Sequence, residues 1–592
     1  MYINIAKVDF CLCKAIDYHN EYLTLSALAD GEITIMIPHI VDQNCATSIS
    51  YSKDKSNWTE TVVDNTEQTI TIPVSSGDNV YLKGVARTWY NDGGGAHIDS
   101  NVGINVSGNI MSLLYADDFK GKKALPEESR YTFVELFSYA AYIINAKNLI
   151  LPATALNEAC YIAMFSGCTS LTTTPKLPAT TLALGCYTEM FSGCTSLTTT
   201  PELPATTLVD GCYAGMFSGC TSLTTTPKLP ATTLANDCYA EMFKGCTSLT
   251  TTPELPATTL AESCYDNMFS GCTSLTTTPE LPATALAKSC YAYMFASCTS
   301  LTTTPELPAT TLAAACYNSM FDRCTSLTTA PELPATTLAE SCYNHMFYWC
   351  ESLRTAPELP ATTLAKSCYD NMFVGCTSLT TAPELPATTL AESCYGYMFA
   401  GCTSLTTTPE LPATTLAGFC YNYMFAWCTA LTTAQALPAL ILKYGCYSGM
   451  FKGCTSLTTG PELPATTLAL GCYTQMFSGC TSLTTAPELP ATTLTKSCYD
   501  NMFVGCTSLT TAPELPATTL AINCYNTMFF GCKKLNSITM LATDISAADC
   551  LHNWVNDVAS TGTFTKAASM TSLPTGASGI PTGWTVVDYI AA

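Results

Sequence analysis

The chain has 592 residues, of which only 12% are charged, and its 24 Lys and Arg residues against 46 Asp and Glu residues give a net charge of −22. An acidic chain of this kind is a poor partner for the phosphates of a nucleic acid. The apolar residues are distributed periodically, without an unbroken apolar run of about 18 residues, so the composition predicts no membrane insertion either.

The first 118 residues alternate apolar and polar side chains, which is typical of β-strands. The alternation is clearest in TSISYS (47–52), QTITIPVSSGDNVYLKG (68–84) and NVGINVSGNIMSLLY (101–115), and a Gly-rich turn covers residues 91–95. We therefore predict a small β-sandwich over residues 1–118. Lys7, Asp9 and Lys14 interrupt the stretch where a secretory signal would need an apolar core, so we expect a chain that is not exported by that route.

Residues 150–537 repeat one sequence unit fifteen times. The string CYxxMFxxC begins at Cys160, returns at Cys186 and Cys212, and continues at this constant interval of twenty-six positions as far as Cys524. Before the array, Leu136-Phe137 echoes the Met-Phe pair of the unit, which predicts a degenerate capping repeat at 119–149. After Cys532 the pattern decays, and we expect residues 538–592 to close the end, because a last unit without a neighbour would expose its apolar face.

One copy, Leu260 to Glu280, shows what each unit is expected to form. Leu260, Cys264 and Met268 share one stripe at helical spacing, and Ala261, Tyr265 and Phe269 share the next, so the pattern predicts a helix with one broad apolar face. Gly271 is placed to end that helix in the left-handed conformation. The β-branched run 273–278 predicts a short strand that Pro279 stops, and LPATTL provides the return loop.

The pattern MFxGCTSL…LP resembles the AFxGCxxLxxIxIP unit of BspA-type leucine-rich repeats, lengthened here to twenty-six positions by an added Cys-Tyr. The expected fold is therefore an α/β solenoid of leucine-rich-repeat-like coils, each with a short parallel strand and a helix, preceded by the β-sandwich. The resemblance implies adhesion or attachment, because the family is found on bacterial surfaces and, in this LPATTL form, in proteins of gut bacteria and their phages. It does not identify a ligand.

The 34 cysteines follow the repeat, with two in each unit, Cys550 at the sixteenth position, and Cys11, Cys13 and Cys45 near the start. Cys264 and Cys272 lie eight residues apart, about 12 Å along a helix, which is beyond the bridging limit of about 7 Å. Geometry alone leaves bridges open between second cysteines of neighbouring units. We favour buried reduced thiols used as small hydrophobic side chains.

Candidate binding residues are those where one copy departs from its neighbours on the outer face. Aromatic or His side chains stand three places after the first Cys in four copies, and Trp replaces the terminating Gly in two of these same copies. The set is Tyr293, His345, Tyr348, Trp349, Tyr397, Tyr423 and Trp427. Such a stripe fits a sugar ring or a partner protein, and the alternative is that the rings pack on one another or on a neighbouring domain.

Two other features of the repeat are candidates for function. Leu440 and Ile441 replace the paired Thr of LPATTL, and this apolar step is an interface candidate that drift could also explain. A column of Glu residues runs through eleven copies, with Lys176, Lys228 and Ala436 as its other occupants. Carboxylates stacked about 4.8 Å apart repel one another, so they are expected to face solvent, where a cation could bridge them.

The sequence predicts a protein that binds or builds and is not an enzyme. It holds no nucleophile elbow, Walker loop, HExxH or dinucleotide fingerprint, and it indicates no catalytic residue, metal or cofactor. The leading hypothesis is a phage virion component, a head or tail fibre-type protein assembled in the host cytoplasm. Its N-terminal domain would dock on other virion proteins and its solenoid would meet a host-surface glycan or protein.

Alternatives remain open. The chain could be a surface or secreted bacterial adhesin of the same repeat family, or a purely decorative virion protein. A homo-oligomer is expected by analogy with fibres, and a trimer is the simplest guess, although the sequence shows no coiled-coil heptads.

Overall fold

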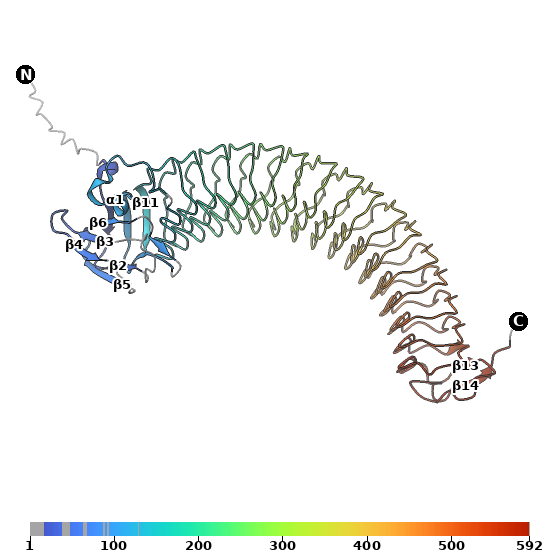
Figure 1. Cartoon of the computed structure of the whole chain (residues 1–592). Coiled ribbons are helices and arrows are strands. Elements are labelled where there is room, and N and C mark those ends of the chain that lie inside the picture. The colour runs from blue at the N-terminus through green and yellow to red at the C-terminus, as the bar shows by residue number, and fades with distance from the viewer. Residues whose placement is uncertain are drawn as a thin grey trace, which may run out of the picture. The chain divides into compact units, whose positions relative to one another are not determined.

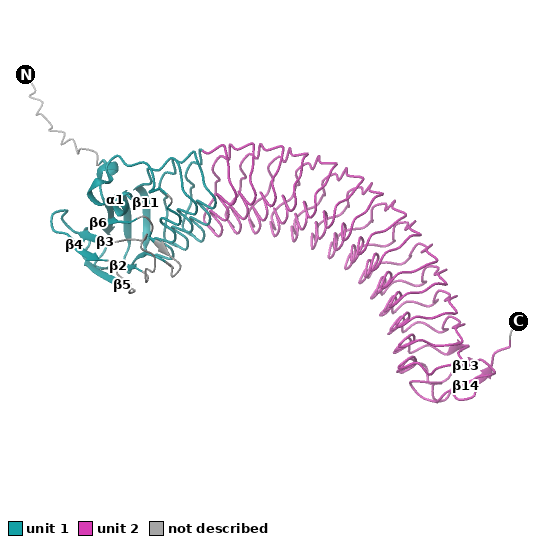
Figure 2. Cartoon of the chain, viewed as in Figure 1, with its two compact units in different colours: residues 1–204 teal, residues 205–592 magenta. Residues whose placement is uncertain are grey.

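The computed structural model describes residues 17–37, 48–62, 68–86, 89–91, 94–127 and 129–590 (Figure 1). Cys11, Cys13, Cys45 and part of the predicted Gly-rich turn lie outside this set. The chain divides into two compact units, residues 1–204 and 205–592 (Figure 2). None of the helices formed by the described residues has the length and apolar character that a membrane crossing requires.

Unit 1 opens with two β-sheets built from the alternating segments of the sequence. The larger sheet has the order β11-β10-β1-β6-β3-β4, and a three-stranded sheet has the order β5-β2-β9. The strands of both sheets are β1 (Leu23–Ala27), β2 (Gly31–Ile37), β3 (Ser48–Ser52), β4 (Thr59–Val62), β5 (Gln68–Val74), β6 (Asn79–Val85), β9 (His97–Ser100), β10 (Ile104–Asn109) and β11 (Ile143–Ile150). Alternate residues of several strands are buried, as in Ile33 and Ile35 of β2 or Val80 and Leu82 of β6, which is what half-buried strands require.

Short elements complete this part of unit 1. A two-stranded ribbon pairs β7 (Tyr90–Asn91) with β8 (Gly94–Gly95). Three short helical turns are η1 (Tyr18–Asn20), α1 (Ser112–Tyr115) and η2 (Ala116–Phe119). In the described part of the chain, α1 is the only α-helix.

The β-domain passes into the repeat array through a shared sheet. Strand β11 pairs in parallel with β10, and an isolated bridge then joins Asn145 to Thr173 of the first copy. Residues 131–139 form a degenerate coil whose backbone N–H groups donate to the first copy, as in Phe133 to Cys160 O at 2.8 Å and Phe137 to Met164 O at 2.9 Å. Compact unit 1 therefore includes the capping segment and the first copies, so the sequence boundary near residue 118 does not coincide with its edge.

Unit 2 is a stack of coils. We number the coils along the chain from coil 1 at Cys160, which still belongs to unit 1, to coil 15 at Cys524. The helix predicted for each copy is wrong. The segment from Cys264 to Cys272 is a run of turns in which Ser263, Asn267 and Gly271 all have positive φ, of 50°, 54° and 75°. A left-handed residue at every fourth place interrupts any α-helix. Because the apolar residues recur at a spacing of four, the pattern fits this turn ribbon as well as a helix of 3.6 residues per turn.

The hydrogen bonds of the ribbon explain why it forms. Every second N–H stays within the coil, as in Met268 N to Tyr265 O at 3.2 Å, whereas the others reach the following coil, as in Phe269 N to Met294 O at 2.9 Å and Gly271 N to Ala296 O at 2.7 Å. An isolated helix would satisfy these donors within itself. Here the neighbouring coil is part of the secondary structure, so a coil cannot form alone.

The interior of unit 2 consists of columns of identical side chains. Tyr rings of successive coils stack with centroids about 5.8 Å apart, as for Tyr291 and Tyr317, and Phe rings stack at about 5.8 Å, as for Phe295 and Phe321. In the described coils, the segment predicted as a strand forms only isolated parallel bridges, such as Thr329 to Thr355. Each stacked aromatic pair contributes about 0.5–1.5 kcal/mol beyond its burial, so the stack is cohesive along its length.

The repeat cysteines are buried inside these columns. All the cysteines that the structure describes are free, and the second thiol of nearly every coil donates to a carbonyl of the preceding coil, as in Cys272 Sγ to Phe243 O at 3.1 Å. Burial raises the pKa of these thiols, for example that of Cys246 to about 12. They serve as small hydrophobic side chains with a weak donor, as the repeat predicts.

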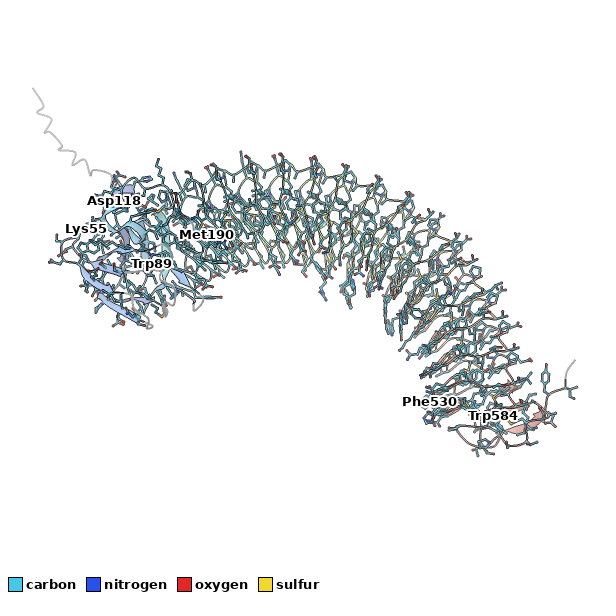
Figure 3. All side chains as sticks on the ribbon, viewed as in Figure 1. Lys55, Trp89, Asp118, Met190, Phe530 and Trp584 are labelled. Atoms are coloured by element: carbon cyan, nitrogen blue, oxygen red, sulfur yellow. The ribbon has the colours of Figure 1, made fainter. Side chains whose placement is uncertain are left out.

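The C-terminal end of unit 2 continues the stack with three strands in one parallel sheet, β12 (Ser537–Met540), β13 (Thr563–Lys566) and β14 (Thr585–Asp588). Trp554 takes the Met position after coil 15 and is fully buried, with its centroid 6.4 Å from that of Tyr525. Trp584 lies further along in the same end region (Figure 3) and donates to Ala559 O at 2.7 Å. The Trp554 indole thus covers the apolar face of the last coil.

Candidate functional site

The outer edge of each coil is formed by the three left-handed positions of the turn ribbon. In coil 5 these are Ser263, Asn267 and Gly271, and the same three places recur in every coil of unit 2. Side chains that differ between copies concentrate here. The candidate residues Tyr293, His345, Trp349, Tyr397, Tyr423 and Trp427 all occupy such positions, with φ between 52° and 59°. Non-Gly residues in this region are strained, and they stand here in nearly every coil, so the strain belongs to the repeat as a whole.

The structure divides the predicted aromatic stripe into two clusters. One lies at coil 8, where the ring centroids of His345 and Tyr348 are 5.0 Å apart and those of Tyr348 and Trp349 are 6.4 Å apart. The other spans coils 10 and 11. Tyr293, in coil 6, has no ring contact with either cluster among the described residues. A continuous stripe is therefore not formed.

The coil 8 cluster is surrounded by polar and charged groups. The Arg323 guanidinium of coil 7 lies 5.7 Å from the Tyr348 ring centroid, which is a cation–π contact. His345 Nδ1 is in hydrogen-bond contact with Asn344 Oδ1, and burial lowers the pKa of His345. Burial also raises the pKa of Asp370, in the next coil, to about 6. The site can therefore offer donors, acceptors and an aromatic surface to one ligand.

Trp349 is the most exposed aromatic side chain of this cluster. Its ring lies over Gly375 of coil 9, where an added Cβ would meet Trp349 Cδ2 at 2.9 Å. The glycine therefore seats the indole against the backbone of the next coil. The side chain nevertheless stays 43% exposed. One side of a Trp held flat in this way can stack against an apolar or sugar surface at little entropic cost.

The second cluster is a row of rings along coil 11, made of Phe419, Tyr423 and Trp427. Tyr423 stacks on Tyr397 of coil 10 with centroids 4.9 Å apart and an interplanar angle of 3°. Its hydroxyl donates to Gln475 Oε1 at 2.9 Å, and the same oxygen accepts from Lys452 Nζ at 2.7 Å. Sequence reasoning missed Phe419, although a Phe at a place where other copies hold Ser was the available signal.

These rings lie against glycines of coil 12. Gly445, Gly449 and Gly453 fill all three left-handed positions, and an added Cβ on each would lie 2.3, 2.4 and 2.7 Å from Phe419, Tyr423 and Trp427 respectively. Each ring therefore lies against backbone. The sequence left open whether the rings only pack on their own neighbours. Tyr423 does so, because Tyr397 covers one side of its ring and Gly449 covers the other.

The remaining candidates are also exposed. Leu440 and Ile441 are 58% and 59% exposed on the approach to coil 12. The residues of the Glu column are exposed in every copy, as predicted for stacked carboxylates. Among the described residues, no group of three His, Cys, Asp or Glu side chains is arranged to hold a metal ion.

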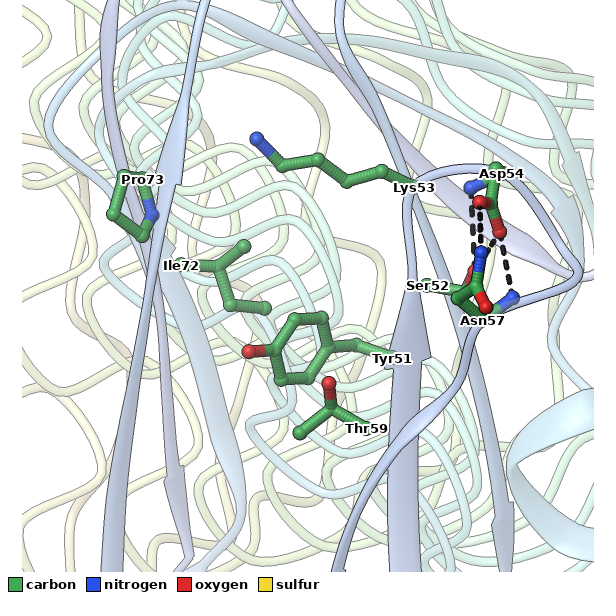
Figure 4. Close-up of a pocket in the computed structure, with 8 residues that line it drawn as sticks. All are labelled: Tyr51, Ser52, Lys53, Asp54, Asn57, Thr59, Ile72 and Pro73. Atoms are coloured by element: carbon green, nitrogen blue, oxygen red, sulfur yellow. Dashed lines mark hydrogen bonds between the residues drawn. The ribbon is translucent and has the colours of Figure 1, made fainter.

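A shallow pocket in the β-domain lies between the β3–β4 hairpin and β5 (Figure 4). Asp54 at its rim accepts from the N–H groups of Ser56 and Asn57 at 2.8 and 2.7 Å and from the Asn57 side chain at 2.7 Å. These hydrogen bonds hold its pKa below the usual range. The carboxylate is thus fully used in closing the hairpin, and the pocket offers no free charged group from this residue.

Comparison with known families decides the relationship of the chain. The BspA type leucine rich repeat region matches in six copies, over residues 135–267, 236–380, 288–432, 340–459 and 446–550. This chain belongs to the BspA-type leucine-rich-repeat family. The match supports a structural or adhesion repeat protein. Searches of curated proteins and of solved structures gave no match.

Proposed function

We propose that this BspA-type protein is a non-enzymatic adhesin whose coil 8 cluster, made of Arg323, His345, Tyr348 and Trp349, contacts a surface glycan or protein. The observation that carries the proposal is the half-exposed Trp349 ring, seated on Gly375 and bordered by polar groups from coils 7 to 9. Exposed aromatic and Arg side chains held in place by their surroundings are typical anchors of binding surfaces.

We further propose that the chain is a fibre-type component of a phage virion. In this proposal the N-terminal β-domain docks on other virion proteins while unit 2 meets the host surface. The buried free thiols of the repeat favour assembly in a reducing compartment such as the host cytoplasm. A bacterial surface or secreted adhesin of the same repeat family is the second candidate, and a decorative virion protein is the third.

Repeat consensus provides a variant that tests the ligand site without disturbing the fold. The triple change His345→Asn, Tyr348→Ser and Trp349→Gly gives coil 8 the residues that coil 5 already holds at Asn267, Ser270 and Gly271. Binding of the labelled full chain to intact host cells should fall at least about tenfold, because roughly 1.4 kcal/mol is lost with the anchor. A matched control, Tyr293→Asn, should bind as the parent does.

Two results would count against the proposal. Unchanged cell binding by the triple variant would leave the decorative role as the better explanation. An antibody against the repeat array could label bacterial envelopes and fail to label purified phage particles. That result would contradict the virion assignment and remain consistent with an adhesin.

A further inference from the structure

Exposed apolar side chains of unit 2 are concentrated in a short stretch of the stack. Ten large apolar or aromatic side chains are exposed between residues 205 and 537, and six of them lie between Phe419 and Leu470. The six are Phe419, Trp427, Leu440, Ile441, Tyr444 and Leu470, which we call the coil 11–13 patch. Exposed apolar patches of this kind mark interaction surfaces.

Five members of the patch follow one another along neighbouring coils, and Trp427 lies further along coil 11, two left-handed positions after Phe419. The ring centroids of Phe419 and Tyr444 are 5.0 Å apart, and their planes meet edge to face. Tyr444 and Leu470 occupy the same position in successive coils, which the hydrogen bond from Gly445 N to Leu470 O, at 3.0 Å, ties together. Leu440 and Ile441 precede Tyr444 on the same coil, and Ile441 forms a parallel bridge with Thr467 of coil 13.

The patch coincides with the longest stretch of the chain that lacks carboxylates. No Asp or Glu occurs between Glu410 and Glu462, and Ala436 replaces the Glu that the column would place there. The two charged residues inside the stretch are Lys443 and Lys452, so its net charge is +2 in a chain whose net charge is −22. Elsewhere along the stack, exposed Glu side chains recur in nearly every coil.

We infer that the coil 11–13 patch is the contact surface between two copies of this chain. Two such acidic chains repel each other over most of their surfaces, and the repulsion is smallest where the carboxylates are missing. An isologous contact needs one self-complementary apolar patch on each copy. Interfaces between identical subunits are rich in apolar and aromatic side chains and poor in charge at their centre, which describes this patch.

The rings of the patch are also ordered before any contact is made. Phe419 and Trp427 lie against Gly445 and Gly453, so little side-chain freedom is lost when a second copy covers them. The coil 8 cluster has a different character, since it includes Arg323 and His345 and lies beside Asp370 of coil 9. The copy contact and the ligand site are therefore separate surfaces on unit 2.

Sedimentation of the full chain tests the inference. The parent chain should form a concentration-dependent dimer with a dissociation constant in the micromolar range, about −8 kcal/mol. Raising the salt concentration should tighten the dimer, because salt screens the repulsion between the acidic chains and leaves the apolar contact unaffected. An association that weakens with salt, or a chain that stays monomeric up to about 100 μM, would overturn the inference.

A second variant, in which patch residues are replaced by the residues of the repeat consensus, tests where the contact lies. Trp427→Gly, Leu440→Thr and Ile441→Thr together install residues that most other coils hold, so the fold should persist, and circular dichroism checks this. The dimer should weaken at least about 100-fold, equivalent to roughly 2.7 kcal/mol. Trp349→Gly is the matched control and should leave the dimer intact. A dimer that survives the triple change, or one that the control disrupts equally, refutes the assignment of this surface.

Discussion

The contact between the Trp427 ring and Gly453 tests how neighbouring coils pack against each other. Gly453 has a φ of 73°, and an added Cβ would approach Trp427 Cδ1 to 2.7 Å. Gly479, one coil further along, has a φ of 78°, but its added Cβ would meet only Gly453 backbone atoms, with Cα at an ordinary 3.6 Å. Replacing either glycine with Ala therefore imposes the same backbone strain, while only one replacement displaces a ring.

The expected magnitudes follow from these distances. An Ala in the left-handed region costs about 1–2 kcal/mol, which applies to both variants. Overpacking against a ring adds about 1–3 kcal/mol in a closed core. Because Trp427 is 46% exposed, its ring can move outward, so the lower half of that range is expected. Gly453→Ala should thus lower the free energy of unfolding by about 1–2 kcal/mol more than Gly479→Ala does.

Urea denaturation followed by circular dichroism measures the difference, and tryptophan fluorescence reports the displaced indole as a red shift in Gly453→Ala alone. Repeating both substitutions in a Trp427→Gly background completes a double-mutant cycle. The excess cost of Gly453→Ala should vanish there. Equal costs for the two glycines in the parent, or an excess that persists without Trp427, would show that the ring does not determine the need for glycine.

Three other predictions concern the interior and the end of the stack. A thiol reagent at pH 8 should leave the repeat cysteines of the native chain unmodified and modify them after denaturation, because burial raises their pKa; modification throughout the native array would contradict the columns. The pKa of Asp370 is raised by burial to about 6, above 3.8 in the unfolded chain, so its ionisation destabilises the fold as pH rises through this window. Asp370→Asn gives coil 9 the residue that coil 8 already holds as Asn344. The change should leave the free energy of unfolding unaltered near pH 4 and raise it by about 1–2 kcal/mol at pH 7.5, as measured by urea titrations at the two pH values. The same effect at both pH values would mean that Asp370 is solvated. Trp554→Ala should lower the free energy of unfolding by about 3–5 kcal/mol and raise the rate of amide hydrogen exchange first in coil 15 and the segment after it. A uniform rise in exchange along unit 2 would mean that the indole does not act as a cap.

The candidate site was only partly visible in the sequence. Departures from the repeat identified Trp349 and Trp427, because a strict consensus makes each exception conspicuous. The same departures could not show that Tyr423 is covered on both sides or that coil 8 and coil 11 form separate clusters. Those properties depend on the residues that stand one coil away, a full repeat further along the chain, and especially on the glycines of coil 12.

By itself the sequence determined the number of repeats, their length, the identity of every buried column and the alternation that produces the N-terminal strands. These properties follow from local periodicity, since a side chain that recurs once in every repeat must meet its own copy in the next coil. Tertiary structure decided what the backbone does between those columns. A spacing of four residues suits both a helix and a ribbon of turns, and the choice depends on whether alternate N–H groups bond within the coil or to the next one, as Phe269 does to Met294. That partner exists only once the coils are stacked.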